Sequence, residues 1–254
     1  MVSVAQVMTG NPVCVKPGDL VTHARSVMRN HGYRALPVVE GGKLVGLISR
    51  GDVMLVTSTK ANLTVAGIMN TILLSVKPED DVKDAAKVLI KSGIRQLPVV
   101  ESESVVGIIS SMDILKSFLS SGFEPKTAKV SDVMTETVIS CSPDDDLSVL
   151  WSKMMVRGFS GLPVVKEGVV KGMITRTDIL KHFSARISKE SGKPRNVKVG
   201  KIMNSPAVTI RPVDKVSKTA HILVEKKIMR MPVVDDKSQL LGILDIEDVI
   251  RAYL

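Results

Sequence analysis

Four copies of one phrase, set at near-constant spacing, constrain the fold of this 254-residue chain more than any other feature. Each copy opens with Val-x-x-[Val/Ile]-Met and reaches Pro-Val-Val 29 residues after the Met, at Met8 and Pro37, Met69 and Pro98, Met134 and Pro163, and Met203 and Pro232. Each closes with GLISRGD (46–52), GIISSMD (107–113), GMITRTD (172–178) or GILDIED (242–248). Such constancy excludes coincidence, so the chain is predicted to consist of four structural repeats.

Within a repeat, the hydrophobic periodicity changes in a defined order. An extended segment such as NPVCVKP (11–17) leads into a Pro-x-Asp turn, whose Asp is expected to cap the next helix. In the first repeat that helix carries Val21, Ala24 and Met28 at helical spacing and ends before Gly32. Two β-branched runs follow as a β-hairpin, and a second helix begins near the Ser/Thr-x-x-Asp of the closing phrase. Each repeat is therefore expected to be β-α-β-β-α.

A repeat of about 55 residues is too small to bury both faces of its sheet alone, so the repeats are expected to pair. The predicted class is an α+β fold with two modules, and four repeats could close a flat disc within one chain. The expected bounds are 1–58, 62–120, 127–184 and 196–254 for the repeats, and 1–122 and 123–254 for the modules. The oligomeric state stays open, because the same surfaces could also form a homodimer.

The composition narrows the class of protein. No stretch approaches the roughly 18 uninterrupted apolar residues of a membrane span, and the N-terminal stretch has no basic region followed by an apolar run, so a cytoplasmic protein away from the membrane is expected. Two cysteines and four histidines show no metal-ligand spacing, and no catalytic motif is present, so neither a metal site, a catalytic cofactor nor an enzyme is expected. The formal charge of +9 favours anionic partners.

The closing phrase supplies groups that suit a phosphate and a ribose. A Ser or Thr at a helix start offers its hydroxyl and free backbone N–H groups to an anion. An Asp one turn later can accept hydrogen bonds from two vicinal ribose hydroxyls. The phosphate candidates are Ser49, Ser110 and Thr175, and the ribose candidates are Asp52, Asp113 and Asp178. The alternative is a capping box, which needs no ligand.

The opening phrase, the segments GYRALPVV (32–39) and GIRQLPVV (93–100), and the closing phrase together resemble the CBS domain family, over nearly the whole chain. The resemblance implies that two repeats form a Bateman module and that clefts between them bind AMP, ADP, ATP or S-adenosylmethionine. The arrangement of four repeats is similar to the γ subunit of AMP-activated protein kinase and to stand-alone prokaryotic CBS proteins. A regulatory, energy-sensing module that signals to an effector protein is therefore expected, provided that the ligand prefers one arrangement over another.

The fourth closing phrase has Asp245 where the others have Ser or Thr. Asp245 can still cap a helix, but its carboxylate would lie where the phosphate belongs. Two unit charges about 5 Å apart repel by roughly 3 kcal/mol at an effective dielectric constant near 20. Repeat four is therefore expected to be closed to phosphorylated ligands, whereas this argument does not exclude ligands without a phosphate.

Cations and apolar walls complete the predicted sites. The candidate phosphate cations are Arg34, Arg95, Arg50, Arg176 and Arg230, each of which could instead be a solvated surface charge. The candidate adenine walls are Val13, Tyr33 and Leu36 in repeat one, Leu74, Ile94 and Leu97 in repeat two, and Ile139, Phe159 and Leu162 in repeat three, where core packing is the alternative. Because the clefts lie between repeats, the sequence does not say which arginine reaches which cleft.

A second class of function is nucleic-acid binding through the linker at 181–201. Seven Lys or Arg stand there against one acid, so the segment could follow a phosphate backbone. No motif that reads bases is present, and aromatic residues make up only 3% of the chain, which leaves little surface for base stacking. Nucleic-acid binding is therefore the weaker hypothesis.

Overall fold

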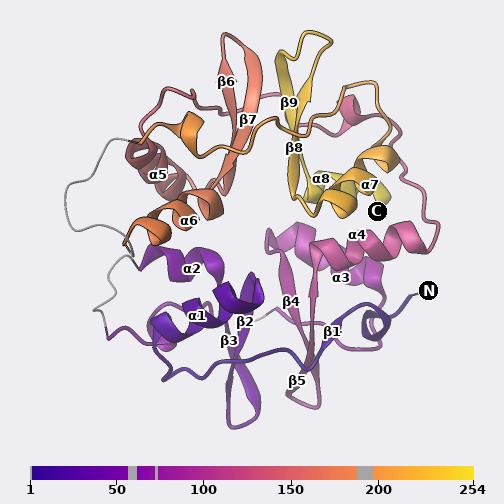
Figure 1. Cartoon of the computed structure of the whole chain (residues 1–254). Coiled ribbons are helices and arrows are strands. Elements are labelled where there is room, and N and C mark those ends of the chain that lie inside the picture. Colours follow the sequence, from indigo (N-terminus) through magenta and orange to yellow (C-terminus); the bar gives the residue numbers. More distant parts are fainter. Residues whose placement is uncertain (1, 57–61, 72–73, 188–196) are drawn as a thin grey trace. The chain divides into compact units, whose positions relative to one another are not determined.

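The structure is a computed structural model that describes residues 2–56, 62–71, 74–187 and 197–254 (Figure 1). Helices and strands are mixed in all four repeats, as the predicted α+β class requires. The chain divides into two compact units. One unit is Met1–Glu124 together with Tyr253–Leu254, and the other is Pro125–Ala252, so each holds two of the sequence repeats.

In the first unit, each repeat consists of a helix, a β-hairpin and a second helix (Figure 1). The elements of repeat one are η1 (Val4–Gln6), β1 (Thr9–Gly10), α1 (Val21–His31), β2 (Ala35–Glu40), β3 (Lys43–Ser49) and α2 (Arg50–Leu55). Those of repeat two are η2 (Val65–Gly67), α3 (Val82–Ser92), β4 (Gln96–Glu101), β5 (Ser104–Ser110) and α4 (Ser111–Ser120). The two hairpins share one sheet, in the order β1-β5-β3-β2 with β4 paired to β5.

The second unit repeats the same order of elements. Repeat three contains η3 (Val130–Asp132), α5 (Leu147–Val156), β6 (Gly161–Lys166), β7 (Val169–Thr175) and α6 (Arg176–Ile187). Repeat four contains η4 (Val199–Lys201), α7 (Val216–Lys226), β8 (Arg230–Val234), β9 (Leu240–Asp245) and α8 (Ile246–Tyr253). The hairpins β6-β7 and β8-β9 are both antiparallel, as predicted from their β-branched runs.

The predicted helix face is confirmed in repeat one, where Val21, Ala24 and Met28 are buried in one core cluster with residues of β2 and β3. Gly32 ends α1 in the left-handed conformation, with φ of 74°, which glycine adopts without the clash of a Cβ atom. Helical periodicity and a terminal glycine therefore located this helix correctly.

Two local expectations are wrong. The extended segment expected to begin each repeat is reduced to a single parallel bridge, such as Val15 to Val38 in repeat one. The Asp of the Pro-x-Asp turn does not cap the following helix. Asp19 instead accepts from the Lys16 N–H at 2.7 Å, which closes the turn itself, and α1 begins two residues after Asp19.

Each opening phrase lies on the other repeat of its unit. The Val4 N–H donates to the Asp80 carbonyl at 2.9 Å, and the Val65 N–H donates to the Asp19 carbonyl at 2.8 Å. The second unit has the same exchange, from Val130 to Asp214 and from Val199 to Asp145, each at 3.0 Å. The two repeats of a unit are therefore joined through their turns as well as through their cores.

The exchange explains why each copy carries both a Met in its opening phrase and a Gly in its closing phrase. A Cβ atom on Gly107 would lie 2.3 Å from Sδ of Met8, and one on Gly46 would lie 2.5 Å from Sδ of Met69. In the second unit, a Cβ atom on Gly172 would lie 2.6 Å from the Asn204 carbonyl oxygen. The Gly thus makes room for the opening phrase of the paired repeat.

Alanine at these glycines is expected to destabilise the two units unequally. At Gly107 the nearest atoms all belong to the flexible Met8 side chain, so Gly107→Ala should cost about 1 kcal/mol of unfolding free energy. At Gly172 a backbone oxygen must move, so Gly172→Ala should cost about 2–3 kcal/mol. Urea unfolding followed by circular dichroism measures both losses. A loss at Gly107 equal to or larger than that at Gly172 would contradict this packing account.

Candidate functional site

The Ser/Thr and Asp of each closing phrase meet where a strand ends and a helix begins. Ser49 is the N-cap of α2, and Oδ2 of Asp52 accepts from its N–H and its hydroxyl, both at 2.7 Å. The Asp52 N–H donates back to Oγ of Ser49 at 3.3 Å. The same reciprocal bonds join Ser110 to Asp113 and Thr175 to Asp178. The capping box that the sequence left open as an alternative is therefore present in three repeats.

The capping box does not use the whole carboxylate. Its bonds to Asp52, Asp113 and Asp178 all go to Oδ2. Within the described residues, Oδ1 of these three side chains accepts no hydrogen bond. All three residues are half-buried at the surface of their units. Each Asp is thus held in one orientation by its own helix while one oxygen stays available.

The strand register places Arg34 and Arg95 beside these junctions. Ala35 lies opposite Ser49 in the hairpin, and the Arg34 carbonyl accepts from the Arg50 N–H at 2.7 Å. In repeat two, the Arg95 carbonyl accepts from the Ser111 N–H at 3.1 Å. Each arginine therefore directly precedes the strand residue that faces the N-cap.

Arg230 joins repeat four to repeat three. Its Nη1 donates to the Gly161 carbonyl at 3.0 Å, and its Nη2 donates to Oγ of Ser160 at 2.8 Å. Gly161 lies opposite the N-cap Thr175, and Ser160 occupies the position of Arg34. Repeat three, which has no arginine of its own there, thus receives one from repeat four. Ser160 and this crossing were missed by sequence reasoning.

In repeat four, Asp245 forms an ion pair with Arg230. Nη2 of Arg230 lies 2.9 Å from Oδ2 of Asp245, and the two residues face each other across the β8-β9 ladder. Repeats one and three have Ala35 and Gly161 at the place of Arg230, so their junctions are not filled in this way. The position in repeat four that corresponds to the phosphate candidates of the other repeats is therefore occupied by the protein's own carboxylate and guanidinium.

Asp248 in α8 follows Asp245 by three residues, and its pKa is raised. Its Oδ2 accepts from the Asp245 N–H at 2.9 Å, but the Asp245 carboxylate has no proton to donate, unlike the Ser hydroxyls of the other repeats. Burial raises the pKa of Asp248, the backbone hydrogen bond from Asp245 opposes this, and the Asp245 charge raises it further. Folding therefore shifts the pKa of Asp248 above its ordinary value.

This shift predicts a pH dependence of stability. A carboxyl whose pKa is raised by folding stabilises the fold increasingly as pH falls through that raised pKa towards the ordinary value near 3.9. Relative to Asp248→Asn, the wild type is therefore expected to gain unfolding free energy between pH 7 and pH 4, as urea unfolding can measure. Asp214→Asn is the control of opposite sign, because the Lys218 hydrogen bond lowers the pKa of Asp214. A pH-independent difference for Asp248→Asn would contradict the assignment.

Arg50 and Arg176, two of the candidate phosphate cations, donate to backbone carbonyls of their own repeats. Nη2 of Arg50 donates to the carbonyls of Gly32 at 3.0 Å and Tyr33 at 2.6 Å, just past the end of α1. Nη2 of Arg176 donates to the Met154 carbonyl at 2.7 Å. Burial lowers the pKa of both groups, although a guanidinium remains charged. These two arginines tie the first helix of their repeat to the second.

The candidate adenine walls separate into three groups by exposure. Val13, Leu74 and Ile139 occupy equivalent positions and are exposed, at 38%, 40% and 40%, despite being large and apolar. Tyr33, Ile94 and Phe159 are half-buried. The expectation for the three leucines is corrected, because their side chains belong to the cores and offer no surface to a ligand; these are Leu36, Leu97 and Leu162.

Much of the basic linker lies outside the described residues, including Lys189, Lys193 and Arg195. Of its described part, Lys198 pairs with Asp146 at 3.0 Å. The described ranges contain no cluster of three or more His, Cys, Asp or Glu suited to a metal ion. None of the helices in the described ranges has the length and apolarity to cross a membrane.

The chain belongs to the CBS domain family, which matches residues 4–58, 65–120, 130–185 and 199–254. Protein MJ1225 of Methanocaldococcus jannaschii is 28% identical over 267 residues, which cover 95% of each chain. The crystal structure of MJ1225, which its authors propose as an archaeal homologue of γ-AMPK, matches all of both chains at a TM-score of 0.83 and 25% identity.

Two further matches cover different shares of this chain. Protein MJ1404 of the same organism is 31% identical over 261 residues, and the match covers 98% of this chain but 61% of MJ1404. The CBS domain pair of protein MJ0100, solved in complex with 5′-methylthioadenosine and S-adenosyl-L-methionine, covers half of this chain and 95% of that pair at a TM-score of 0.43 and 25% identity.

Proposed function

We propose that this protein is a non-enzymatic sensor that binds adenosine nucleotides at the strand–helix junctions of repeats one, two and three. The observation that carries the proposal is the difference between these repeats and repeat four. Three junctions combine a Ser or Thr hydroxyl, a carboxylate with one available oxygen and an adjacent arginine. Repeat four has the same backbone but fills the corresponding space with Arg230 and Asp245.

The groups at a junction match the parts of an adenosine nucleotide. The available Oδ1 of Asp113 would accept hydrogen bonds from the vicinal ribose hydroxyls. A phosphate would accept from the Ser110 hydroxyl and from Arg95. The exposed Leu74 would pack on the adenine, because burying apolar area is favourable.

Binding of a phosphate would change the capping box. A serine hydroxyl has one proton, and in this structure Ser110 donates it to Asp113. If a phosphate accepts the hydrogen bond of the Ser110 hydroxyl, Asp113 keeps only the hydrogen bond from the Ser110 backbone N–H. The ribose hydroxyls would then compensate the carboxylate for the lost bond, so phosphate and ribose recognition would be coupled.

Signalling would use the exchange of opening phrases. Met8 of repeat one packs on Gly107 of repeat two. A shift of β5 towards or away from a ligand at Ser110 would therefore change the packing of both repeats. An effector protein, or a second copy of the chain, could then distinguish the liganded unit from the free one. The identity of that effector is not specified by the site.

Calorimetric titration of the full chain with AMP, ADP, ATP and S-adenosylmethionine tests the proposal. AMP should bind, whereas 2′,3′-dideoxy-AMP, which lacks both ribose hydroxyls, should bind at least tenfold more weakly. A short DNA duplex at two salt concentrations is the comparison ligand. Binding of DNA that weakens steeply with salt, together with no binding of any adenosine ligand, would overturn the proposal in favour of nucleic-acid binding. Binding of S-adenosylmethionine alone would change the ligand class.

A further inference from the structure

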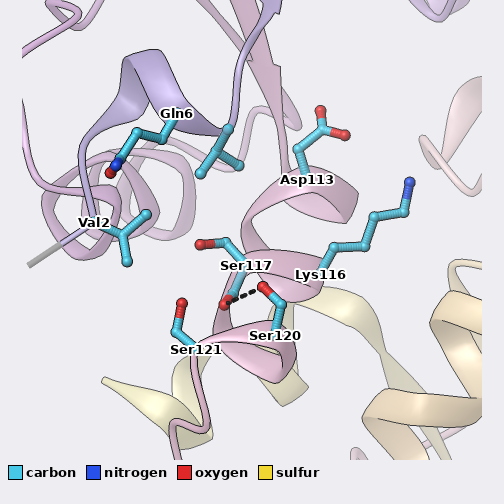
Figure 2. Close-up of a pocket in the computed structure, with 8 residues that line it drawn as sticks. Val2, Gln6, Asp113, Lys116, Ser117, Ser120 and Ser121 are labelled. Carbon is cyan, nitrogen blue, oxygen red and sulfur yellow. Dashed lines mark hydrogen bonds between the residues drawn. The ribbon is translucent and has the colours of Figure 1, made fainter.

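A pocket of about 450 Å³ lies in the first unit, between the opening segment of repeat one and helix α4 of repeat two (Figure 2). Its volume falls in the range of sites for small molecules, roughly 300–1,000 Å³. The lining residues are Val2, Gln6, Val7, Asp113, Lys116, Ser117, Ser120 and Ser121. Only Asp113 among them belongs to the strand–helix junctions described above.

Ser117 is the strongest sign that the pocket receives a polar group. The residue is 5% exposed, and its Oγ has no hydrogen-bond partner among the described residues. Figure 2 shows the Ser117 hydroxyl on the side of α4 that faces Val2 and Gln6. A buried hydroxyl without a partner costs free energy that a bound polar group would recover.

Lys116 supplies a positive charge at the same pocket. It lies one turn after Asp113 on α4, so both side chains project from one edge of the helix (Figure 2). In the described part of the chain, Lys116 forms no ion pair, and Oδ2 of Asp113 is occupied by Ser110. The Lys116 ammonium group and the serine hydroxyls of this lining can donate to the oxygens of a phosphate group, while the Asp113 carboxylate in the same lining is the ribose candidate.

The Lys-Ser pair sets repeat two apart. The residues three and four positions after the Asp of the closing phrase are Leu55 and Val56 in repeat one, and Arg251 and Ala252 in repeat four. Repeat three has Lys181 followed by a histidine. A site built on Lys116 and Ser117 would therefore act at one junction and would make repeat two chemically different from the others.

We propose that the pocket between η1 and α4 binds a phosphate group through Lys116 and Ser117. Two sources share this chemistry. One is the outer phosphate chain of an adenosine nucleotide whose ribose is bound by Asp113, which rests on the proposed function. The other is free inorganic phosphate, which does not. In either case the site distinguishes ligands by phosphate content at repeat two, next to the ribose candidate.

The test compares the wild type with Lys116→Gln and Ser117→Ala, using Lys87→Gln on the neighbouring α3 as the charge-matched control. Amide signals of Ser117 and Ser121 in nuclear magnetic resonance spectra report on titration with inorganic phosphate, AMP and ATP. We expect phosphate or ATP to shift these signals in the wild type, and Lys116→Gln and Ser117→Ala to weaken that effect about tenfold. Lys87→Gln should match the wild type.

The outcomes separate this proposal from the proposed function. If Lys116→Gln lowers the ATP affinity about tenfold more than the AMP affinity, the nucleotide is the source. If only inorganic phosphate binding is lost, the free anion is the source, and this holds even where adenosine ligands fail to bind. If neither phosphate nor ATP moves the Ser117 and Ser121 signals, or if both variants bind like Lys87→Gln, the proposal is wrong, whatever AMP does at Asp113.

Discussion

AMP binding at repeat two is expected to weaken roughly thirtyfold when Asp113 is replaced by asparagine. Asparagine can still accept the Ser110 N–H through its Oδ1, so the start of α4 should be preserved. The variant loses the negative charge that strengthens the two ribose hydrogen bonds, a loss of about 2 kcal/mol, and about 1.4 kcal/mol is a factor of ten in affinity. Asp52→Asn and Asp178→Asn should have the same effect at their own junctions.

Asp248→Asn is the matched control for these variants. It occupies the equivalent helix position in repeat four, where Arg230 and Asp245 fill the junction. Calorimetric titration with AMP should give wild-type affinities for Asp248→Asn. Urea unfolding should give this variant an unfolding free energy close to that of the other Asp→Asn variants. Equal loss of AMP binding in Asp113→Asn and Asp248→Asn would mean that the effect comes through the fold and would contradict the ribose assignment.

The second large effect is expected from Asp245→Asn, which should tighten AMP binding at repeat three about tenfold. In the wild type, the Asp245 carboxylate neutralises Arg230 at 2.9 Å while Arg230 also bonds Ser160 and Gly161 beside Thr175. Both side chains of this ion pair are about four-fifths buried, so their attraction is only partly screened by solvent. Removing the Asp245 charge means that this carboxylate no longer neutralises the positive charge of Arg230, which should favour a phosphate at repeat three.

This gain should depend on repeat three itself. Combining Asp245→Asn with Asp178→Asn should abolish it, because the ribose contact of the same junction is weakened. Asp236→Asn is a charge-matched control, since Asp236 is an exposed residue that pairs with Arg211. Unchanged or weaker AMP binding in Asp245→Asn, at wild-type stability, would contradict the assignment of Arg230 to the cleft of repeat three.

The fold was largely predictable because the same sequence pattern recurs in four repeats. The α1 face of Val21, Ala24 and Met28, the hairpins and the start of each second helix follow from periodicity and from the closing phrase. Local patterns misled in two places. Asp19 was expected to cap α1, but a carboxylate two residues before the helix closes its own turn instead. The first strand was expected from an apolar run, yet only a single residue pairs.

The sequence predicted which residues belong to the candidate sites, but it did not predict which residues of different repeats contact one another. The sequence named both Arg34 and Ser49 as phosphate candidates, but only the strand register shows that the two lie at one end of a hairpin. The sequence could not show that Arg230 reaches Ser160 about 70 residues earlier, nor that Leu36 and Leu97 are core residues, since both facts depend on how the repeats pair. Lys116 and Ser117 carry no motif, and only burial and the pocket distinguish them.

Equilibrium dialysis of labelled AMP against the wild type and the triple variant Asp52→Asn, Asp113→Asn, Asp178→Asn tests the central claim most directly. The account predicts that the wild type binds AMP at up to three sites per chain and that the folded triple variant loses measurable binding at the same concentrations. AMP bound equally by both proteins would contradict it, because the nucleotide would then lie somewhere other than the three strand–helix junctions.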